Sequence, residues 1–184
     1  MSSKLIFNYG TVCSGKTCYL LNVCFNYEKV GWNTIVIKPS LDTRSTMIET
    51  RAKVPPREAD IVIGPNDSLF EYTSTINNAD VILVDECQFL SPEQVDELRE
   101  ISITKDIDVL CFGLRTDYNL HLFDASKRLF ELADEINEIK TICAVCGKKA
   151  GFNKKVDYEP SGQQVIPGWD NFQARCFHHF KDND

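Results

Sequence analysis

The sequence Gly10-Thr11-Val12-Cys13-Ser14-Gly15-Lys16-Thr17 matches the pattern G-x-x-x-x-G-K-[ST] at every defined position. An apolar run, Leu5–Tyr9, precedes it, and a run with helical character, Cys18–Glu28, follows it. In this strand–loop–helix context, backbone N–H groups at the start of the helix bind nucleotide phosphates. The pattern therefore predicts a nucleoside triphosphate site, with Lys16 on the β- and γ-phosphates and Thr17 on Mg²⁺. A chance Gly-Lys-Thr on a surface turn is the alternative, and both flanks argue against it.

Short apolar, β-branched runs alternate with helix-like runs over the first 140 residues. Several runs are continuously apolar, as in the strands of a parallel sheet that is covered on both faces. One helix starts with Ser91-Pro92-Glu93-Gln94, which is the signature of a capping box. We therefore expect an α/β core. The predicted strands are Lys4–Asn8, Thr34–Lys38, Ile61–Ile63, Val81–Asp85 and Val109–Gly113, and the predicted helices are Cys18–Val30, Leu90–Thr104 and Asp124–Ala133.

The composition is that of a globular chain: of its 184 residues, 43% are hydrophobic and 26% are charged. The net charge of −7 argues against non-specific nucleic-acid binding, which needs a basic surface, but not against a nucleotide substrate. No apolar run approaches the roughly 20 residues of a membrane helix, and the first strand begins too early to leave room for a signal peptide. We therefore expect a cytoplasmic protein with neither a membrane nor a nucleic-acid partner.

Two acidic residues, Asp85 and Glu86, follow the apolar run Val81–Val84 directly. A buried strand that ends in carboxylates presents them at the carboxyl edge of a parallel sheet, where α/β proteins bind their ligands. Asp85 is then placed to hold Mg²⁺, directly or through water, and Glu86 to take a proton or orient a nucleophile. The alternative is an ordinary solvated strand end.

Further polar and aromatic residues follow the predicted strands. Asp42 and Arg44 come after Thr34–Lys38 and so belong to the same sheet edge, where a guanidinium fork suits phosphate oxygens. An ordinary turn is the alternative for this pair. Aromatic side chains could form the walls around a flat base, although a plain core role is the alternative for each one. These aromatic residues are Phe89, Tyr118, Phe123 and Phe172.

Half of the chain's eight cysteines lie near strands or on the first predicted helix, and three cluster by motif after residue 140. Cys143 and Cys146 form C-x₂-C, and Cys176 and His179 form C-x₂-H, 29 residues later; His178 is the alternative fourth ligand. Two such pairs can close a tetrahedral zinc site, and four protein ligands make it structural. Two unrelated thiol pairs are the alternative. The segment between the pairs would be a loop tied at its base, which suits a lid over a ligand.

Taken together, these motifs resemble the zinc-containing (type II) thymidine kinases, in the short form found in bacteria and phages. The resemblance runs from Lys4 to His179. Besides the phosphate-binding loop and the four metal ligands, it rests on Lys38-Pro39 with Asp42-Thr43-Arg44, Val84-Asp85-Glu86-Cys87-Gln88-Phe89-Leu90, Gly113-Leu114-Arg115-Thr116-Asp117 and Leu122-Phe123.

The resemblance implies transfer of the ATP γ-phosphate to the 5′-OH of thymidine, giving dTMP for DNA synthesis. It implies a P-loop (RecA-like) core in residues 1–140 and a zinc domain in residues 141–184 whose lid (lasso) loop closes over the base. It makes Glu86 the catalytic base and assigns Thr17 and Asp85 to Mg²⁺. The implied phosphate-binding positions are Gly10, Thr11, Val12, Cys13, Ser14, Gly15, Lys16, Thr17, Asp85, Gln88, Asp42 and Arg44. The implied nucleoside-pocket positions are Val12, Phe89, Leu114, Tyr118, Phe123, Val165, Ile166 and Phe172.

The resemblance also implies a homotetramer that uses ATP and thymidine. The chain departs from the family pattern at Tyr118, where Phe is common, and at Pro167 and Trp169, where small residues are common; Pro167 has no N–H to donate to a base. A kinase for another deoxynucleoside, such as deoxyuridine or deoxycytidine, is therefore one alternative. A P-loop ATPase or switch module, whose zinc knuckle binds nucleic acid or a partner, is another.

Overall fold

A six-stranded parallel sheet forms the centre of the protein in the computed structural model, which describes residues 3–42, 46–50, 54–156 and 171–181. The strand order is β5-β2-β6-β7-β1-β8. From one edge to the other, the strands are β5 (Ile61–Ile63), β2 (Thr34–Pro39), β6 (Val81–Val84), β7 (Asp108–Gly113), β1 (Leu5–Tyr9) and β8 (Glu135–Glu138). All their pairings are parallel, which confirms the predicted α/β fold.

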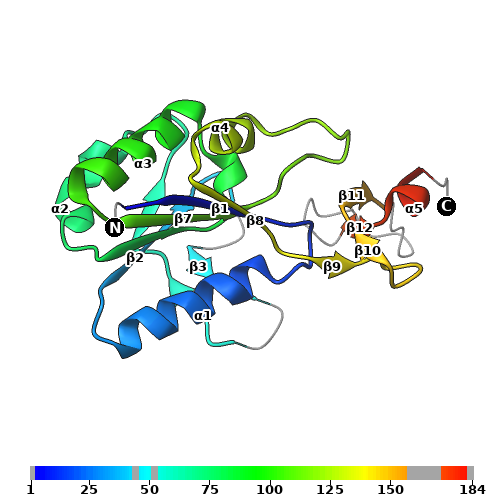
Figure 1. The fold of residues 1–184 in the computed structure, drawn as a ribbon, viewed down its shortest axis with the longest axis horizontal. Helices are drawn as coiled ribbons and strands as arrows, with labels where there is room; N and C mark the ends of the chain where they lie inside the picture. Colours follow the sequence, from blue (N-terminus) through cyan, green and yellow to red (C-terminus); the bar gives the residue numbers. More distant parts are fainter. Residues whose placement is uncertain (1–2, 43–45, 51–53, 157–170, 182–184) are drawn as a thin grey trace, which may run out of the picture.

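Helices cover both faces of the sheet, with α1 (Lys16–Lys29) on one face and α3 (Pro92–Lys105) and α4 (Asp124–Leu132) on the other (Figure 1). Successive residues of a strand point to opposite faces. In β6, Leu83 accordingly packs in the core under α1, and Val84 packs in the core under α3 and α4. Burial on both faces explains why this strand is apolar along its whole length.

The capping box at the start of α3 is confirmed. The Ser91 hydroxyl accepts a hydrogen bond from the Gln94 N–H at 3.1 Å, and the Gln94 side chain accepts one from the Ser91 N–H at 3.0 Å. The helix begins at Pro92 rather than at Leu90, because residues Cys87–Phe89 form a separate 3₁₀ turn. Helix α1 likewise begins at Lys16, inside the phosphate-binding loop, two residues before the predicted start.

Strand β8 was not predicted from the sequence. It pairs with β1 at the edge of the sheet and has only one large apolar residue, Ile136, which is exposed. An edge strand needs no continuous apolar run, so the pattern that identified the inner strands is absent here. Four further elements were not predicted because each is too short to show a periodic pattern: β3 (Met47–Ile48), β4 (Arg57–Glu58), a 3₁₀ turn at Leu69–Tyr72 and α2 (Thr73–Ile76).

The C-terminal region adds two small antiparallel sheets beside the main sheet (Figure 1). Strand β9 (Thr141–Ile142) pairs with β10 (Lys149–Ala150), β11 (Phe152–Lys155) pairs with β12 (Phe172–Arg175), and helix α5 (Phe177–Lys181) follows. We call this region, from β9 to α5, the metal module. The predicted lid residues Val165, Ile166, Pro167 and Trp169 lie outside the described residues. Within the described part of the chain, no helix is both long and apolar enough to cross a membrane.

Candidate functional site at the carboxyl edge of the sheet

The phosphate-binding loop joins β1 to α1 and leaves the start of the helix open. The Gly10 N–H donates to the carbonyl of Gly113 at the end of β7, which ties the loop to the sheet. Gly15, with φ of +84°, is the residue before α1 and provides no side-chain cap. Because the first N–H groups of a helix lack partners within the helix, an uncapped start is available to an anion.

Lys16 is buried inside this loop. Its Nζ donates to the carbonyls of Thr11 at 2.9 Å and Gly10 at 3.3 Å. Burial lowers the pKa of the Lys16 ammonium, and the nearby carboxylates of Glu86 and Asp85 oppose that change. The Thr11 and Ser14 hydroxyl oxygens are buried in the same loop without a hydrogen-bond partner. Because buried polar atoms are almost always paired, these orphaned groups indicate that the loop is built around a polar ligand.

Asp85 and Thr17 meet across the loop. The Thr17 hydroxyl lies 3.4 Å from one carboxylate oxygen of Asp85 and 3.5 Å from the other. Burial, and then the charge of Glu86, raise the pKa of the Asp85 carboxyl to about 7, while Lys16 opposes the rise. A hydroxyl and a carboxylate are oxygen donors of the kind Mg²⁺ prefers, and a cation between them would offset the cost of burying the charge. The residues therefore fit the predicted magnesium site.

Glu86 lies directly after β6, at the turn into the 3₁₀ segment. Its backbone is in the left-handed region, with φ of 49° and ψ of 39°, which costs a non-glycine residue about 1–2 kcal/mol. Its side chain is buried, and its Oε2 accepts a 2.7 Å hydrogen bond from Nε2 of Gln88. Backbone strain of this kind is concentrated at functional sites, where the surrounding structure holds it.

Asp42 follows β2 at the same edge of the sheet. Its Oδ2 lies 3.1 Å from Nζ of Lys38, and both side chains are buried. Lys38 also donates to the carbonyl of Met47 at 3.1 Å. The structure thus places Asp42 in a buried ion pair, and a phosphate contact for it stays a prediction. Arg44 lies outside the described residues.

Six of the eight predicted nucleoside-pocket residues gather in one region. Val12, Leu114, Phe123 and Phe172 belong to one apolar cluster, which also contains residues of the metal module. Phe123 makes an edge-to-face contact with Phe89, with the ring centroids 6.0 Å apart, and the rings of Phe172 and Tyr118 are 5.9 Å apart. One apolar surface therefore includes Val12 of the phosphate-binding loop, Leu114 after β7 and Phe172 of the metal module. Such a surface suits a flat base. Val165 and Ile166 lie outside the described residues.

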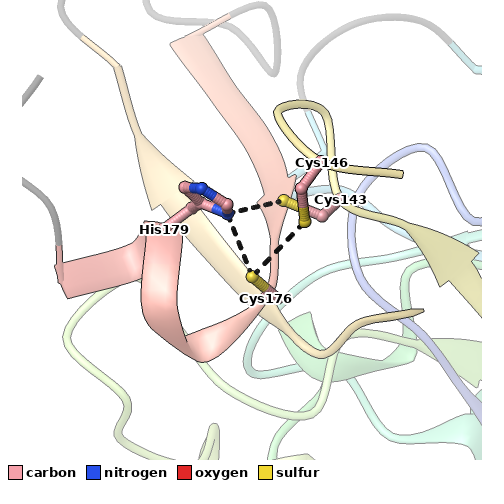
Figure 2. A group of neighbouring side chains, drawn as sticks. All are labelled: Cys143, Cys146, Cys176 and His179. Carbon is pink, nitrogen blue, oxygen red and sulfur yellow. Dashed lines mark hydrogen bonds between the residues drawn. The ribbon is translucent and has the colours of Figure 1, made fainter. Parts of the chain in front are cut away.

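The four predicted metal ligands converge, as Figure 2 shows. Cys143 and Cys146 lie on the turn between β9 and β10, Cys176 follows β12, and His179 lies on α5. Their four ligand atoms are all within 4.8 Å of one another. The Cys146 and Cys176 sulfurs are 3.9 Å apart, close to the roughly 3.8 Å that two thiolates on one tetrahedral zinc would show.

The geometry of this cluster favours His179 as the fourth ligand. Nδ1 of His179 lies 3.2 Å from the Cys176 sulfur and 3.7 Å from the Cys143 sulfur. Burial acts to raise the pKa of the Cys143 thiol, but backbone N–H groups around it lower the pKa to about 5. A thiolate is the form that binds a metal, so the donor set and the lowered pKa of Cys143 both fit a closed Cys₃His site. All eight cysteines lie in the described part of the chain, and each is a free thiol.

Two features of the site had no signal in the sequence. Asn153 on β11 reaches from the metal module to the phosphate-binding loop, where its Oδ1 accepts the Val12 N–H at 2.8 Å. An open groove of about 850 Å³ also runs along α1, and it begins at the loop. The residues that line the groove include Ser14, Gly15, Cys18, Tyr19, Phe25, Val54, Pro55, Pro56 and Arg57.

Comparison with known proteins matches residues 3–180 to the family described as thymidine kinase. A thymidine kinase of Streptococcus agalactiae is 36% identical over 99% of both chains. Those of Shewanella oneidensis and Rhodopirellula baltica are 37% and 36% identical over 98% of this chain, covering 97% and 89% of their own lengths. Among solved structures, a replication initiator DnaA bound to AMPPCP and single-stranded DNA aligns over 74% of this chain and 40% of its own, with 22% identity and a TM-score of 0.47.

Proposed function

The chain belongs to the thymidine kinase family, and we propose that it transfers the γ-phosphate of ATP to the 5′-hydroxyl of thymidine with Glu86 as the base. The observation that carries this assignment of roles is the meeting of Lys16, Asp85 and Glu86 at one edge of the sheet. Phosphoryl transfer needs positioning and charge stabilisation more than covalent chemistry, and this arrangement supplies both.

The donor half of the site is the phosphate-binding loop. The open N–H groups at the start of α1, the orphaned hydroxyls of Thr11 and Ser14, and the Lys16 ammonium receive the phosphates of ATP. The groove along α1 takes the rest of the nucleotide, because it begins at the same loop. Thr17 and Asp85 hold Mg²⁺, which when bound neutralises charge on the phosphate oxygens during transfer.

The acceptor half is the apolar region of Val12, Leu114, Phe123 and Phe172. These side chains pack against the thymine ring, and Glu86 accepts the proton of the 5′-hydroxyl as the bond to phosphorus forms. The hydroxyl of Tyr118, which is partly exposed beside Phe172, adds a polar group to this wall. The choice between thymidine and deoxyuridine therefore depends on this surface.

The Cys₃His cluster holds a structural zinc ion. Three sulfurs and one imidazole nitrogen within 4.8 Å of one another can close a tetrahedral zinc site, and a zinc site with four protein ligands has no open position for catalysis. Residues 141–184, which contain the metal module, form the second domain after the core of residues 1–140. We expect one zinc per chain in metal analysis of the purified protein; a zinc-free protein with all four ligands intact would refute the site.

The protein forms a homotetramer in the cytoplasm. An exposed apolar side chain away from the groove supports association: Ile103 on α3 exposes 61% of its surface. The eight free thiols are compatible with a reducing compartment. Light scattering on the eluting protein measures the mass directly, and a mass of a single chain at micromolar concentration would contradict the tetramer.

The decisive test is incubation with ATP, Mg²⁺ and each of thymidine, deoxyuridine and deoxycytidine, followed by detection of the monophosphate. We expect thymidine monophosphate as the main product and ADP in equal amount. An ATPase or switch module would instead release inorganic phosphate without any nucleoside and respond to added nucleic acid. Equal use of all three nucleosides would retain the kinase but overturn its preference for thymidine.

A further inference from the structure

The carboxamide of Gln88 lies between the proposed base and the end of β7. Its Nε2 donates to Oε2 of Glu86 at 2.7 Å, and its Oε1 accepts the backbone N–H of Leu114 at 2.9 Å. Gln88 is buried, with 3% of its surface exposed. The side chain therefore joins the turn after β6 to the residue that follows β7.

The orientation of this amide follows from chemistry. A backbone N–H can only donate, so it requires the oxygen end of the Gln88 carboxamide. The nitrogen end must then face Glu86, where it donates to a carboxylate oxygen and strengthens the contact through the charge. A flipped amide would place a donor against the Leu114 N–H and an acceptor against the Glu86 carboxylate, and both contacts would be lost.

The backbone opposite the amide leaves room only for glycine. A Cβ added at Gly113 would lie 2.6 Å from Oε1 of Gln88 and 2.6 Å from the Cys87 sulfur. It would also lie 3.1 Å from the backbone nitrogen of Gln88. Close packing of this kind confines the carboxamide to one position, and Glu86 needs such support because its own backbone is in the strained left-handed region.

We propose that Gln88 is a positioning residue for phosphoryl transfer, which holds the Glu86 carboxylate in the place where it meets the acceptor hydroxyl. This inference rests on the proposed function of Glu86 as the base. Gln88 affects the reaction through its contact with Glu86, and the phosphates are bound by the loop instead. Removal of the amide takes away one contact that orients the carboxylate, and a small misplacement of a catalytic group can cost roughly 100-fold in rate.

The test compares Gln88→Met, Glu86→Gln and the double variant with the unchanged enzyme. Methionine keeps the length and apolar stem of Gln88 but makes neither hydrogen bond. We expect Gln88→Met to lower kcat by roughly 10- to 100-fold while the KM values for ATP and thymidine change less than about threefold. The double variant should be no slower than Glu86→Gln, because the amide has no base left to position.

Gln94→Met is the matched control, since Gln94 is equally buried but serves the start of α3. It should lower the melting temperature and leave kcat unchanged at a temperature where the variant is folded. A normal kcat in Gln88→Met, or losses that multiply in the double variant, would overturn the role of Gln88 and leave the proposed function intact. Normal turnover in Glu86→Gln would overturn the base assignment itself, and with it this inference.

Discussion

The backbone N–H of Val12 donates a 2.8 Å hydrogen bond to Oδ1 of Asn153, and this bond joins the phosphate-binding loop to the metal module. The other end of the same side chain, Nδ2, donates to the carbonyl of Thr116 at 3.2 Å. Asn153 is buried, and Val12 packs in one cluster with Cys143 and Ala174. The shape of the loop therefore depends on a segment about 140 residues further along the chain.

Asn153→Ala should destabilise the protein by about 1–3 kcal/mol, because it leaves the Val12 N–H buried without an acceptor. Affinity for ATP should fall as well, since the loop loses one of its anchors. Urea unfolding and ATP titration measure the two effects. Asn153→Leu keeps the side-chain volume and makes neither hydrogen bond, so it should weaken ATP binding as the alanine variant does. Equal ATP affinity in all three proteins would contradict the role of this bond.

Removal of the zinc should weaken ATP binding, even though the metal lies outside the phosphate site. Cys176→Ser deprives the cluster of one sulfur, and the module that carries Asn153 should then lose its order. We expect a lower melting temperature, less than one zinc per chain, and a raised dissociation constant for ATP in calorimetry. Val145→Ala, on the same turn as the first two cysteines, removes no ligand and should behave as the parent. Tight ATP binding by a zinc-free variant would show that the two sites are independent.

Glu86→Gln should keep both substrates bound and lose most of the turnover. The amide has nearly the shape of the carboxylate but cannot accept the proton of the 5′-hydroxyl, a contribution worth typically 10²- to 10⁴-fold. Single-turnover measurement of thymidine phosphorylation, with binding followed separately, distinguishes a lost chemical step from lost affinity. Near-normal turnover would require another residue as the base.

Mg²⁺ should bind less tightly as the pH falls below 7. The pKa of Asp85 is raised to about 7 by burial and by Glu86, so its carboxylate is progressively protonated below that value. The apparent affinity for Mg²⁺ should thus be level above pH 8 and fall by up to about tenfold per pH unit below 7. Titration of Mg²⁺ against the enzyme at fixed ATP measures this dependence. The same profile in Asp85→Asn would exclude Asp85 as its source.

The raised pKa of Asp85 also predicts that the stability of the protein without Mg²⁺ depends on pH. The folded state binds the Asp85 proton more tightly than the unfolded state, whose carboxyl titrates near about 4. The contribution of this proton to stability is therefore complete below about pH 4 and is lost as the pH rises through 7. Urea unfolding of the parent and of Asp85→Asn between pH 5 and pH 8 should show the parent losing stability relative to the variant as the pH rises.

The inner strands and the larger helices follow from local pattern. Val81–Val84 is apolar throughout because both of its faces are covered, and Ser91 to Gln94 carry their capping bonds within four residues. Strand β8 could not be recognised in this way, because Ile136 at the sheet edge is exposed and the strand has no apolar run. Its pairing with β1 places it in the sheet instead. The sequence predicted the metal cluster as two short spaced pairs, with His178 and His179 as alternatives for the fourth ligand. In the structure, α5 places Nδ1 of His179 beside two sulfurs, which favours His179.

By itself, the sequence determined the phosphate-binding loop, the acid pair after β6 and the two short segments that carry the candidate metal ligands. Each of these motifs works through residues that are neighbours along the chain, so spacing is enough to reveal them. Only the tertiary structure decided that Asn153 supports Val12, and that Gln88 lies between Glu86 and Leu114. The Asn153–Val12 and Gln88–Leu114 hydrogen bonds each join a side chain to a backbone N–H on another segment of the chain. Every residue except proline has a backbone N–H, so the sequence carries no mark of which one is used, and the fold alone selects the pair.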